Sequence, residues 1–138
     1  MTARILLVDD DPAVLALVAS RLASGGRYRV HVARGGEEGL KQARKLVPDL
    51  VICDLQMPGV DGPALARELR DDPATRGMPL VFLSSVDAGE REVSGFGGEG
   101  PPIVSKGAPA GRLETVIDAL LGDGPGTAPA PPGSRGLL

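Results

Sequence analysis

Short runs of consecutive apolar residues alternate along the chain with longer segments whose apolar residues recur every three or four positions. The short runs are rich in Val, Ile and Leu, which predicts strands buried on both faces. Strands that alternate with amphipathic helices are typical of a parallel sheet covered by helices on both sides. The predicted strands are Arg4–Val8, Arg29–Val32, Leu50–Asp54, Leu80–Ser84 and Ile103–Ser105.

The first predicted helix has the clearest boundaries. Asp11 can cap it, Pro12 suits its first turn, and Gly25 and Gly26 end it. Three further helices are predicted at about Glu37–Leu46, Gly62–Arg70 and Ala110–Leu121. In these four helices, the apolar period predicts the following inward-facing residues: Val14, Leu15, Val18, Leu22, Leu40, Ala43, Val47, Leu65, Leu69, Leu113, Val116, Ile117 and Leu120.

Two segments depart from this pattern. Between Ser85 and Pro101 the alternation calls for a fourth helix, but five glycines fall there, and each costs about 1 kcal/mol relative to Ala inside a helix. We expect at most a short helical turn near Glu90–Ser94, followed by a mobile loop. From Gly122 onward the chain is rich in Gly and Pro and cannot bury enough apolar surface to fold. We therefore expect one domain over residues 1–121 and a disordered tail, or a linker to a further domain, over 122–138.

Composition narrows the classes of function. The net charge of −3 and the absence of a Lys/Arg stripe argue against direct binding to nucleic acid. No apolar stretch is long enough to predict a signal peptide or a membrane span. The single cysteine, Cys53, cannot form an internal disulfide, fits a reducing compartment, and is expected to be a buried apolar residue. These features favour a cytoplasmic protein with a core of aliphatic residues.

The polar residues that end the strands predict a functional site. Asp9 and Asp10 follow the first strand, Asp54 and Ser84 end the third and fourth, and Lys106 follows the fifth. In an open α/β sheet, ligands bind at the carboxyl edge of the strands. Because carboxylates held close together repel one another, a hard cation such as Mg²⁺ or Mn²⁺ is expected among them. No grouping of His and Cys favours zinc.

A cation beside a lysine and a serine indicates phosphoryl chemistry. Lys106 could hold a phosphoryl oxygen as a point charge, and Ser84 could donate a hydrogen bond to another. Asp54 is the candidate nucleophile because it stands alone at its strand end, while the adjacent Asp9 and Asp10 are better placed as metal anchors. Attack by the Asp54 carboxylate on phosphorus would form an acyl phosphate.

The chain resembles the receiver domain of two-component response regulators. The resemblance rests on Ile-Leu-Leu-Val-Asp9-Asp10-Asp11-Pro, Asp54-Leu-Gln-Met-Pro-Gly-Val-Asp-Gly62, Leu-Ser84-Ser and Ser-Lys106, in the family's order and spacing, over about Arg4 to Leu121. It implies a flavodoxin-like, doubly wound, five-stranded parallel sheet in the order 2-1-3-4-5. It also implies Mg²⁺-dependent phosphorylation of Asp54 by a histidine kinase or phosphotransfer protein, and it leaves a homodimer open.

The resemblance also assigns roles to single residues. It makes Asp10, Asp54 and the backbone carbonyl of Gln56 direct ligands of the metal, and lets Asp9 act through water. It places Ser84 and Lys106 in contact with the phosphoryl group. It does not imply a turnover enzyme, since the protein accepts phosphate on its own aspartate and loses it slowly.

Two positions depart from the family pattern. Members usually carry Pro after the lysine, joined by a cis peptide, whereas here Gly107 follows Lys106; we expect a trans peptide and a less well aimed ammonium. Ile103 stands where the family carries Tyr or Phe, so no ring can turn inward upon phosphorylation. Together with the glycine-rich fourth helix, these changes predict an atypical output switch, with ordering of the segment between Ser85 and Ile103 as its response.

Two alternatives remain open from the sequence. In the first, the fold serves as an interaction module that does not depend on phosphorylation. In the second, it is a Mg²⁺-dependent phosphatase that turns over through an aspartyl phosphate. The second is disfavoured because such enzymes typically place an acid two residues after the nucleophile, and Gln56 cannot act as an acid or base.

Overall fold

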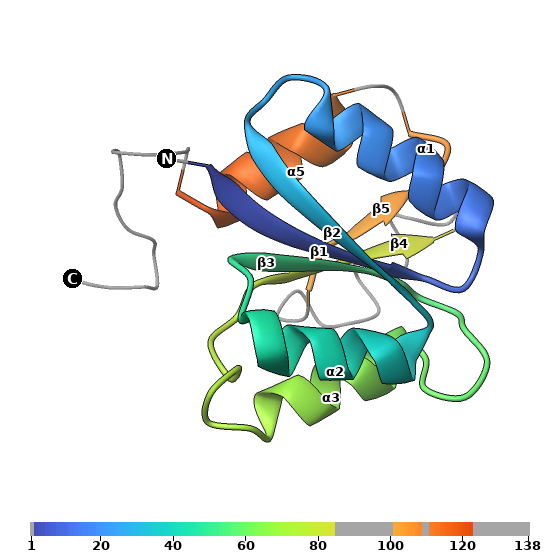
Figure 1. Cartoon of the computed structure of the whole chain (residues 1–138), viewed down its shortest axis with the longest axis vertical. Coiled ribbons are helices and arrows are strands. Elements are labelled where there is room, and N and C mark those ends of the chain that lie inside the picture. Colours follow the sequence, from blue (N-terminus) through green and yellow to red (C-terminus); the bar gives the residue numbers. More distant parts are fainter. Residues whose placement is uncertain (1, 85–100, 109–110, 123–138) are drawn as a thin grey trace.

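Five parallel strands form a single sheet in the order β2-β1-β3-β4-β5. The computed structural model describes residues 2–84, 101–108 and 111–122. Both the fold class and the strand order predicted from the sequence are confirmed (Figure 1). The strands are β1 (Ala3–Asp9), β2 (Tyr28–Arg34), β3 (Leu50–Asp54), β4 (Leu80–Ser84) and β5 (Ile103–Ser105).

Helices cover both faces of this sheet. Figure 1 shows α1 and α5 on one face and α2 and α3 on the other. Their bounds in the described part of the chain are α1 (Pro12–Ala23), α2 (Gly36–Leu46), α3 (Gly62–Arg70) and α5 (Arg112–Leu120). Asp11 caps α1 as predicted, since its Oδ1 accepts a hydrogen bond from the Ala13 N–H at 2.9 Å. Asp61 caps α3 in the same way through the Ala64 N–H.

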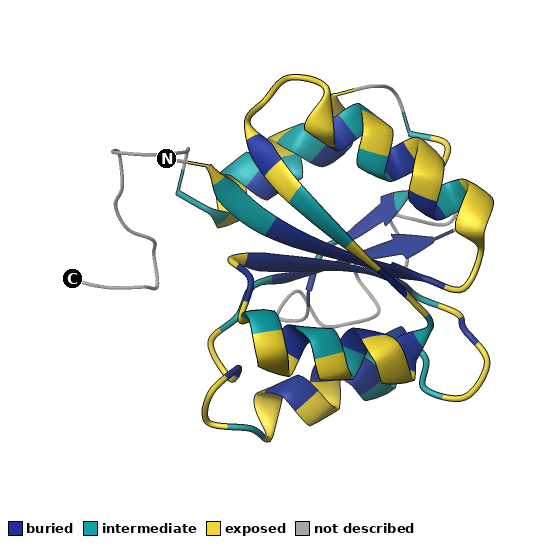
Figure 2. Cartoon of the chain, in the orientation of Figure 1, coloured by how far each residue is buried: buried dark blue, intermediate teal, exposed yellow. Residues whose placement is uncertain are grey.

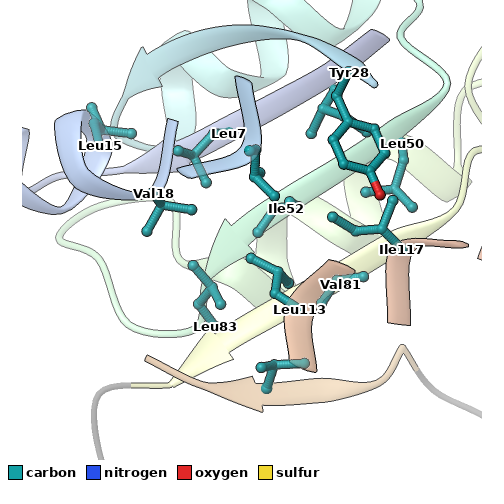
Figure 3. Packing of buried hydrophobic residues seen from close by; sticks show 13 residues of the cluster. Leu7, Leu15, Val18, Tyr28, Leu50, Ile52, Val81, Leu83, Leu113 and Ile117 are labelled. Atoms are coloured by element: carbon teal, nitrogen blue, oxygen red, sulfur yellow. The ribbon is translucent and has the colours of Figure 1, made fainter. Parts of the chain in front are cut away.

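The sheet separates two hydrophobic cores. Successive residues of a strand point to opposite faces, so Ile5 and Leu7 pack beneath α1 and α5, whereas Leu6 and Val8 pack toward α2 and α3. Figure 2 shows β3 and β4 buried along their length and β1 buried from Ile5 onward, and Figure 3 shows the mainly aliphatic side chains that pack on the α1 and α5 side. Cys53 is fully buried in the second core, as expected. Both cores consist almost entirely of aliphatic side chains.

Two of the predicted inward-facing residues are instead exposed. The side chain of Val47 is 45% exposed, because α2 ends at Leu46 and Val47 turns into a left-handed conformation before Pro48. Leu120 is 37% exposed, because it is the last residue of α5 and lies beyond the stripe of Leu113 and Ile117 that reaches the core.

Some predictions concern segments that the structure does not describe. The helical turn near Glu90–Ser94 and the loop after it lie outside the described residues, as does all of the predicted tail over 122–138 except Gly122. In the part of the chain that is described, helices are too short or too polar to traverse a lipid bilayer.

Candidate functional site

The parallel register brings the predicted site residues to one edge of the sheet. Asp9 and Asp54 are the last residues of β1 and β3, and these strands are aligned so that Val8 lies beside Cys53. Ser84 ends β4, and Lys106 follows β5 directly and donates its backbone N–H to the Ser84 carbonyl at 2.8 Å. The edge therefore holds residues from four neighbouring strands, as the sequence predicted.

Three carboxylates meet at this edge. Asp9, Asp10 and Asp54 each offer an oxygen, and these oxygens lie within 4.8 Å of one another. Asp9 is completely buried and Asp54 is only 5% exposed, whereas Asp10 lies at the surface. Asp9 is also held by the backbone, since its Oδ1 accepts the Asp11 N–H at 2.9 Å. Oxygen donors that are rigid on one side and open to solvent on the other fit a hard divalent cation such as Mg²⁺ or Mn²⁺.

Lys106 links two of these carboxylates. Its Nζ lies 3.0 Å from Asp9 Oδ2 and 3.1 Å from Asp54 Oδ1. The peptide bond between Lys106 and Gly107 is trans, as expected, because none of the described peptide bonds is cis. The ammonium reaches the acidic cluster, and its aim toward a phosphoryl group stays a prediction. The turn after β5 is closed by the Gly107 N–H, which donates to Ser105 Oγ at 3.1 Å, and this turn directs Lys106 into the acidic cluster.

The pKa values of both Asp54 and Lys106 are raised in the site. Burial raises the pKa of the Asp54 carboxyl, the Asp9 charge raises it further, and the hydrogen bond from Lys106 only partly offsets these effects. Burial acts to lower the pKa of Lys106, but the hydrogen bonds to Asp9 and Asp54 outweigh it and raise that pKa. Lys106 is thus held as a cation beside a carboxyl that is costly to ionise. A second cation would favour the ionised form of Asp54.

Ser84 and Gln56 flank the acidic cluster. Ser84 is 2% exposed at the end of β4, which lies between β3 and β5. Gln56 is exposed and lies in the segment 55–61 that joins β3 to α3. Met57, next to it, is buried in the second core and anchors this segment. Each residue that the sequence analysis selected therefore lies at or beside the same edge.

Sequence reasoning missed one contact of the site. It assigned Lys106 to an incoming phosphoryl group, whereas in the structure the ammonium also pairs with Asp9. The strand order contains the signal, because β1 and β3 are neighbours, so a side chain that reaches Asp54 also comes within reach of Asp9.

An open, doubly wound sheet with a charged cluster at its carboxyl edge defines the flavodoxin-like class of α/β domains. The family model of the response regulator receiver domain matches residues 5–118, so the chain belongs to that family. It is a receiver domain of the response regulators of two-component systems.

Relatives and solved structures agree with this assignment. The chain is 38% identical over 96 residues to the response regulator PleD of Caulobacter vibrioides, covering 70% of this chain and 21% of PleD. It is 34% identical over 118 residues to the transcriptional regulator RpaA of Synechocystis, covering 86% of this chain and 48% of RpaA. The chain thus spans at most about half of either relative.

Among solved structures, a putative response regulator from Chloroflexus aurantiacus superimposes with a TM-score of 0.78 at 30% identity. That comparison covers 88% of this chain and 98% of the other. The chemotaxis protein CheY4 of Vibrio cholerae gives a TM-score of 0.76 at 25% identity, covering 88% of this chain and all of the other. A receiver fold of ordinary size is therefore common to all three chains.

Proposed function

We propose that this receiver domain is phosphorylated on Asp54 by a histidine kinase or phosphotransfer protein, with Mg²⁺ or Mn²⁺ as the cofactor. The observation that carries the proposal is the convergence of three carboxylates within 4.8 Å, with the Lys106 ammonium 3.1 Å from Asp54. A carboxylate in such a cluster, which is open to solvent at Asp10, can act as the nucleophile on a phosphoryl group.

Each residue then has a defined task. Asp9, Asp10, Asp54 and the Gln56 carbonyl would hold the cation, which supplies charge neutralisation for the phosphoryl oxygens. A free oxygen of Asp54 forms the new O–P bond while the N–P bond of the donor's phosphohistidine breaks. Lys106 and Ser84 bind the oxygens of the transferred phosphoryl group. The ammonium of Lys106 also offsets part of the negative charge of that group.

The same residues support a carrier of phosphate and not a turnover enzyme. Rapid hydrolysis needs a general base to activate water beside the acyl phosphate. Gln56, two residues after Asp54, has no titratable group, and its side chain lies at the surface. The acyl phosphate is therefore expected to persist long enough to act as a signal.

We also propose that the output switch is atypical. Ile103 is 5% exposed and packs in the second core beside Phe82, its register partner on β4. A branched aliphatic side chain in such a core has one stiff arrangement and no ring to turn.

We further propose that residues 1–121 form the receiver domain and that 122–138 form a segment outside it. The family match, which ends at residue 118, supports this division.

The intact mass of the protein after incubation with acetyl phosphate and Mg²⁺ tests the proposal. We expect a single phosphoryl adduct that is absent without Mg²⁺ and absent from Asp54→Ala. An adduct that survives in Asp54→Ala would place the acceptor elsewhere. No adduct under any condition would favour the alternative function, an interaction module that does not depend on phosphorylation.

A further inference from the structure

We propose that Gly36 is a positioning residue for the metal site, because it sets where the segment between β3 and α3 can lie. This inference rests on the proposed function, since that segment carries the Gln56 carbonyl. Gly36 is the first residue of α2, on a different element from every residue assigned to the site so far. Its role is steric: only a residue without a Cβ lets α2 approach this segment so closely.

The contact is formed with the backbone of Val60. A Cβ placed on Gly36 would lie 2.0 Å from the Val60 carbonyl oxygen and 2.6 Å from the Val60 Cβ. Separations under 3.0 Å are essentially never seen for real Cβ atoms, so the two elements would have to part by about 1 Å. Because the Val60 atoms involved include its backbone, no change of rotamer can relieve the overlap.

The rest of the segment leaves few ways to absorb that movement. Its two ends are joined by the Gly62 N–H, which donates to the Leu55 carbonyl at 3.2 Å. A Cβ on Gly62 would lie 2.7 Å from the Asp54 carbonyl oxygen, so that end is also closely packed. Met57 is held in the second core. Only four residues, 58–61, separate Met57 from Gly62, so a displacement of Val60 also shifts Met57 and the adjacent Gln56.

A small displacement matters because of the cation. Mg²⁺ requires nearly ideal octahedral geometry with ligand distances of about 2.0–2.1 Å, so a carbonyl moved by a fraction of an ångström is a poorer ligand. Gly36 has a backbone conformation open to any residue, because its φ is not positive. Alanine is the better helix former of the two residues, so a loss of metal affinity in Gly36→Ala would reflect the contact with Val60 and not the helix.

Binding of Mn²⁺ alone, followed by electron paramagnetic resonance of the free ion, tests the inference in Gly36→Ala. We expect about a tenfold weaker affinity than in the unsubstituted protein, with backbone amide signals of Gln56 and Met57 shifted in heteronuclear spectra. Gly77→Ala is the matched control, because a Cβ there meets nothing within 4 Å and the φ of Gly77 is not positive. Equal affinity of Gly36→Ala and Gly77→Ala would overturn the inference.

Gly36→Ala could fail to fold, which the loss of a cooperative unfolding transition would reveal. A second pair of variants then tests the inference. Gly36→Ala combined with Val60→Gly removes the overlap of the two Cβ atoms but keeps the overlap with the backbone carbonyl at position 60. This double variant should fold and bind Mn²⁺ more weakly than Val60→Gly alone; equal affinity would refute the role of Gly36. If the unsubstituted protein binds Mn²⁺ but takes no phosphate from acetyl phosphate, the proposed function fails while the inference about Gly36 stands.

Discussion

Val47 has an uncommon backbone conformation for a β-branched residue. Its φ is 45°, in the left-handed region, where a Cβ crowds the following carbonyl at a cost of roughly 1–2 kcal/mol. The surroundings hold it there: its N–H donates to the Ala43 carbonyl at 2.9 Å, and its own carbonyl accepts Nη2 of Arg4 at 3.2 Å. The side chain is 45% exposed and contributes little to either core. The conformation is thus maintained by the hydrogen bonds of the backbone.

Val47→Gly is therefore expected to stabilise the protein. Glycine removes the left-handed strain but adds about 0.4–1 kcal/mol of unfolded-state entropy, so a net gain of about 0.5–1 kcal/mol in the free energy of unfolding follows. Urea titration followed by circular dichroism measures it. Val47→Ala retains the Cβ and serves as the control, with a smaller change expected. A Val47→Gly protein less stable than the unsubstituted protein would contradict the interpretation of strain.

At the residue scale, the sequence predicted which side chains meet at the sheet edge more accurately than which helical side chains are exposed. Asp9, Asp54 and Ser84 were found because each ends an apolar run, and a parallel sheet brings such ends together. Val47 was assigned to the core because it continues the apolar period of α2. The period could not show that Val47, one residue past the helix end that was correctly predicted at Leu46, would turn into the left-handed region and be exposed, because this depends on local capping geometry.

At the scale of elements, α5 is joined to the edge of the sheet by a small polar cluster. The Tyr28 hydroxyl donates to Asp118 Oδ1 at 2.7 Å, and the Arg27 guanidinium pairs with Oδ2 of the same carboxylate. The guanidinium also lies over the Tyr28 ring, 5.1 Å from its centroid. Burial alone would raise the pKa of Asp118, but the hydrogen bonds from Arg27 and Tyr28 outweigh it, so the pKa is lowered. This cluster ties the last described helix to β2.

The cluster makes part of the stability depend on pH. A carboxyl with a depressed pKa stabilises the fold above its unfolded value, near 3.9, and this contribution is lost as the pH falls through the folded value. Asp118→Asn should therefore lower the free energy of unfolding by about 1 kcal/mol between pH 5 and pH 7. Urea titrations at a series of pH values measure this. The difference in free energy of unfolding between Asp118→Asn and the unsubstituted protein should shrink below about pH 4. A difference independent of pH would show that the charge of Asp118 contributes nothing.

Element boundaries were predicted less accurately than element types. β2 extends from Tyr28 to Arg34, beyond the predicted Arg29–Val32, because it pairs with β1 along its whole length. Of the added residues, Tyr28 and Ala33 are buried and Arg34 is exposed, and their membership in the strand comes from that pairing. The start of α5 at Arg112 follows a left-handed Gly111, a turn that the apolar period does not encode.

At the scale of the whole molecule, the proposed phosphorylation of Asp54 would act on a sheet that is packed on both faces. The cores on both faces are densely aliphatic, and Ile103 is fixed in one of them. A response by rotation of an aromatic ring at that position is excluded by the residue itself. The proposed response therefore concerns the chain between Ser85 and Ile103, of which the structure describes only the last three residues.

Hydrogen exchange with mass spectrometry tests that response. With Mg²⁺ and a phosphoryl mimic such as beryllofluoride, amides between 85 and 103 are expected to exchange more slowly, since ordering protects amides. Amides of the central strands β1 and β3 should not change. Unchanged exchange between 85 and 103, with the mimic shown to be bound, would rule out ordering as the output.

The position of Tyr28 has a practical consequence. It is the single tyrosine of a chain without tryptophan, so it dominates the intrinsic near-ultraviolet emission of the protein. Its ring lies beside Ile117 in the core that α5 covers (Figure 3), and its hydroxyl contacts Asp118. The emission is thus a native optical reporter of whether the last helix is docked. Undocking of α5 could be followed in real time without attaching a dye to this protein.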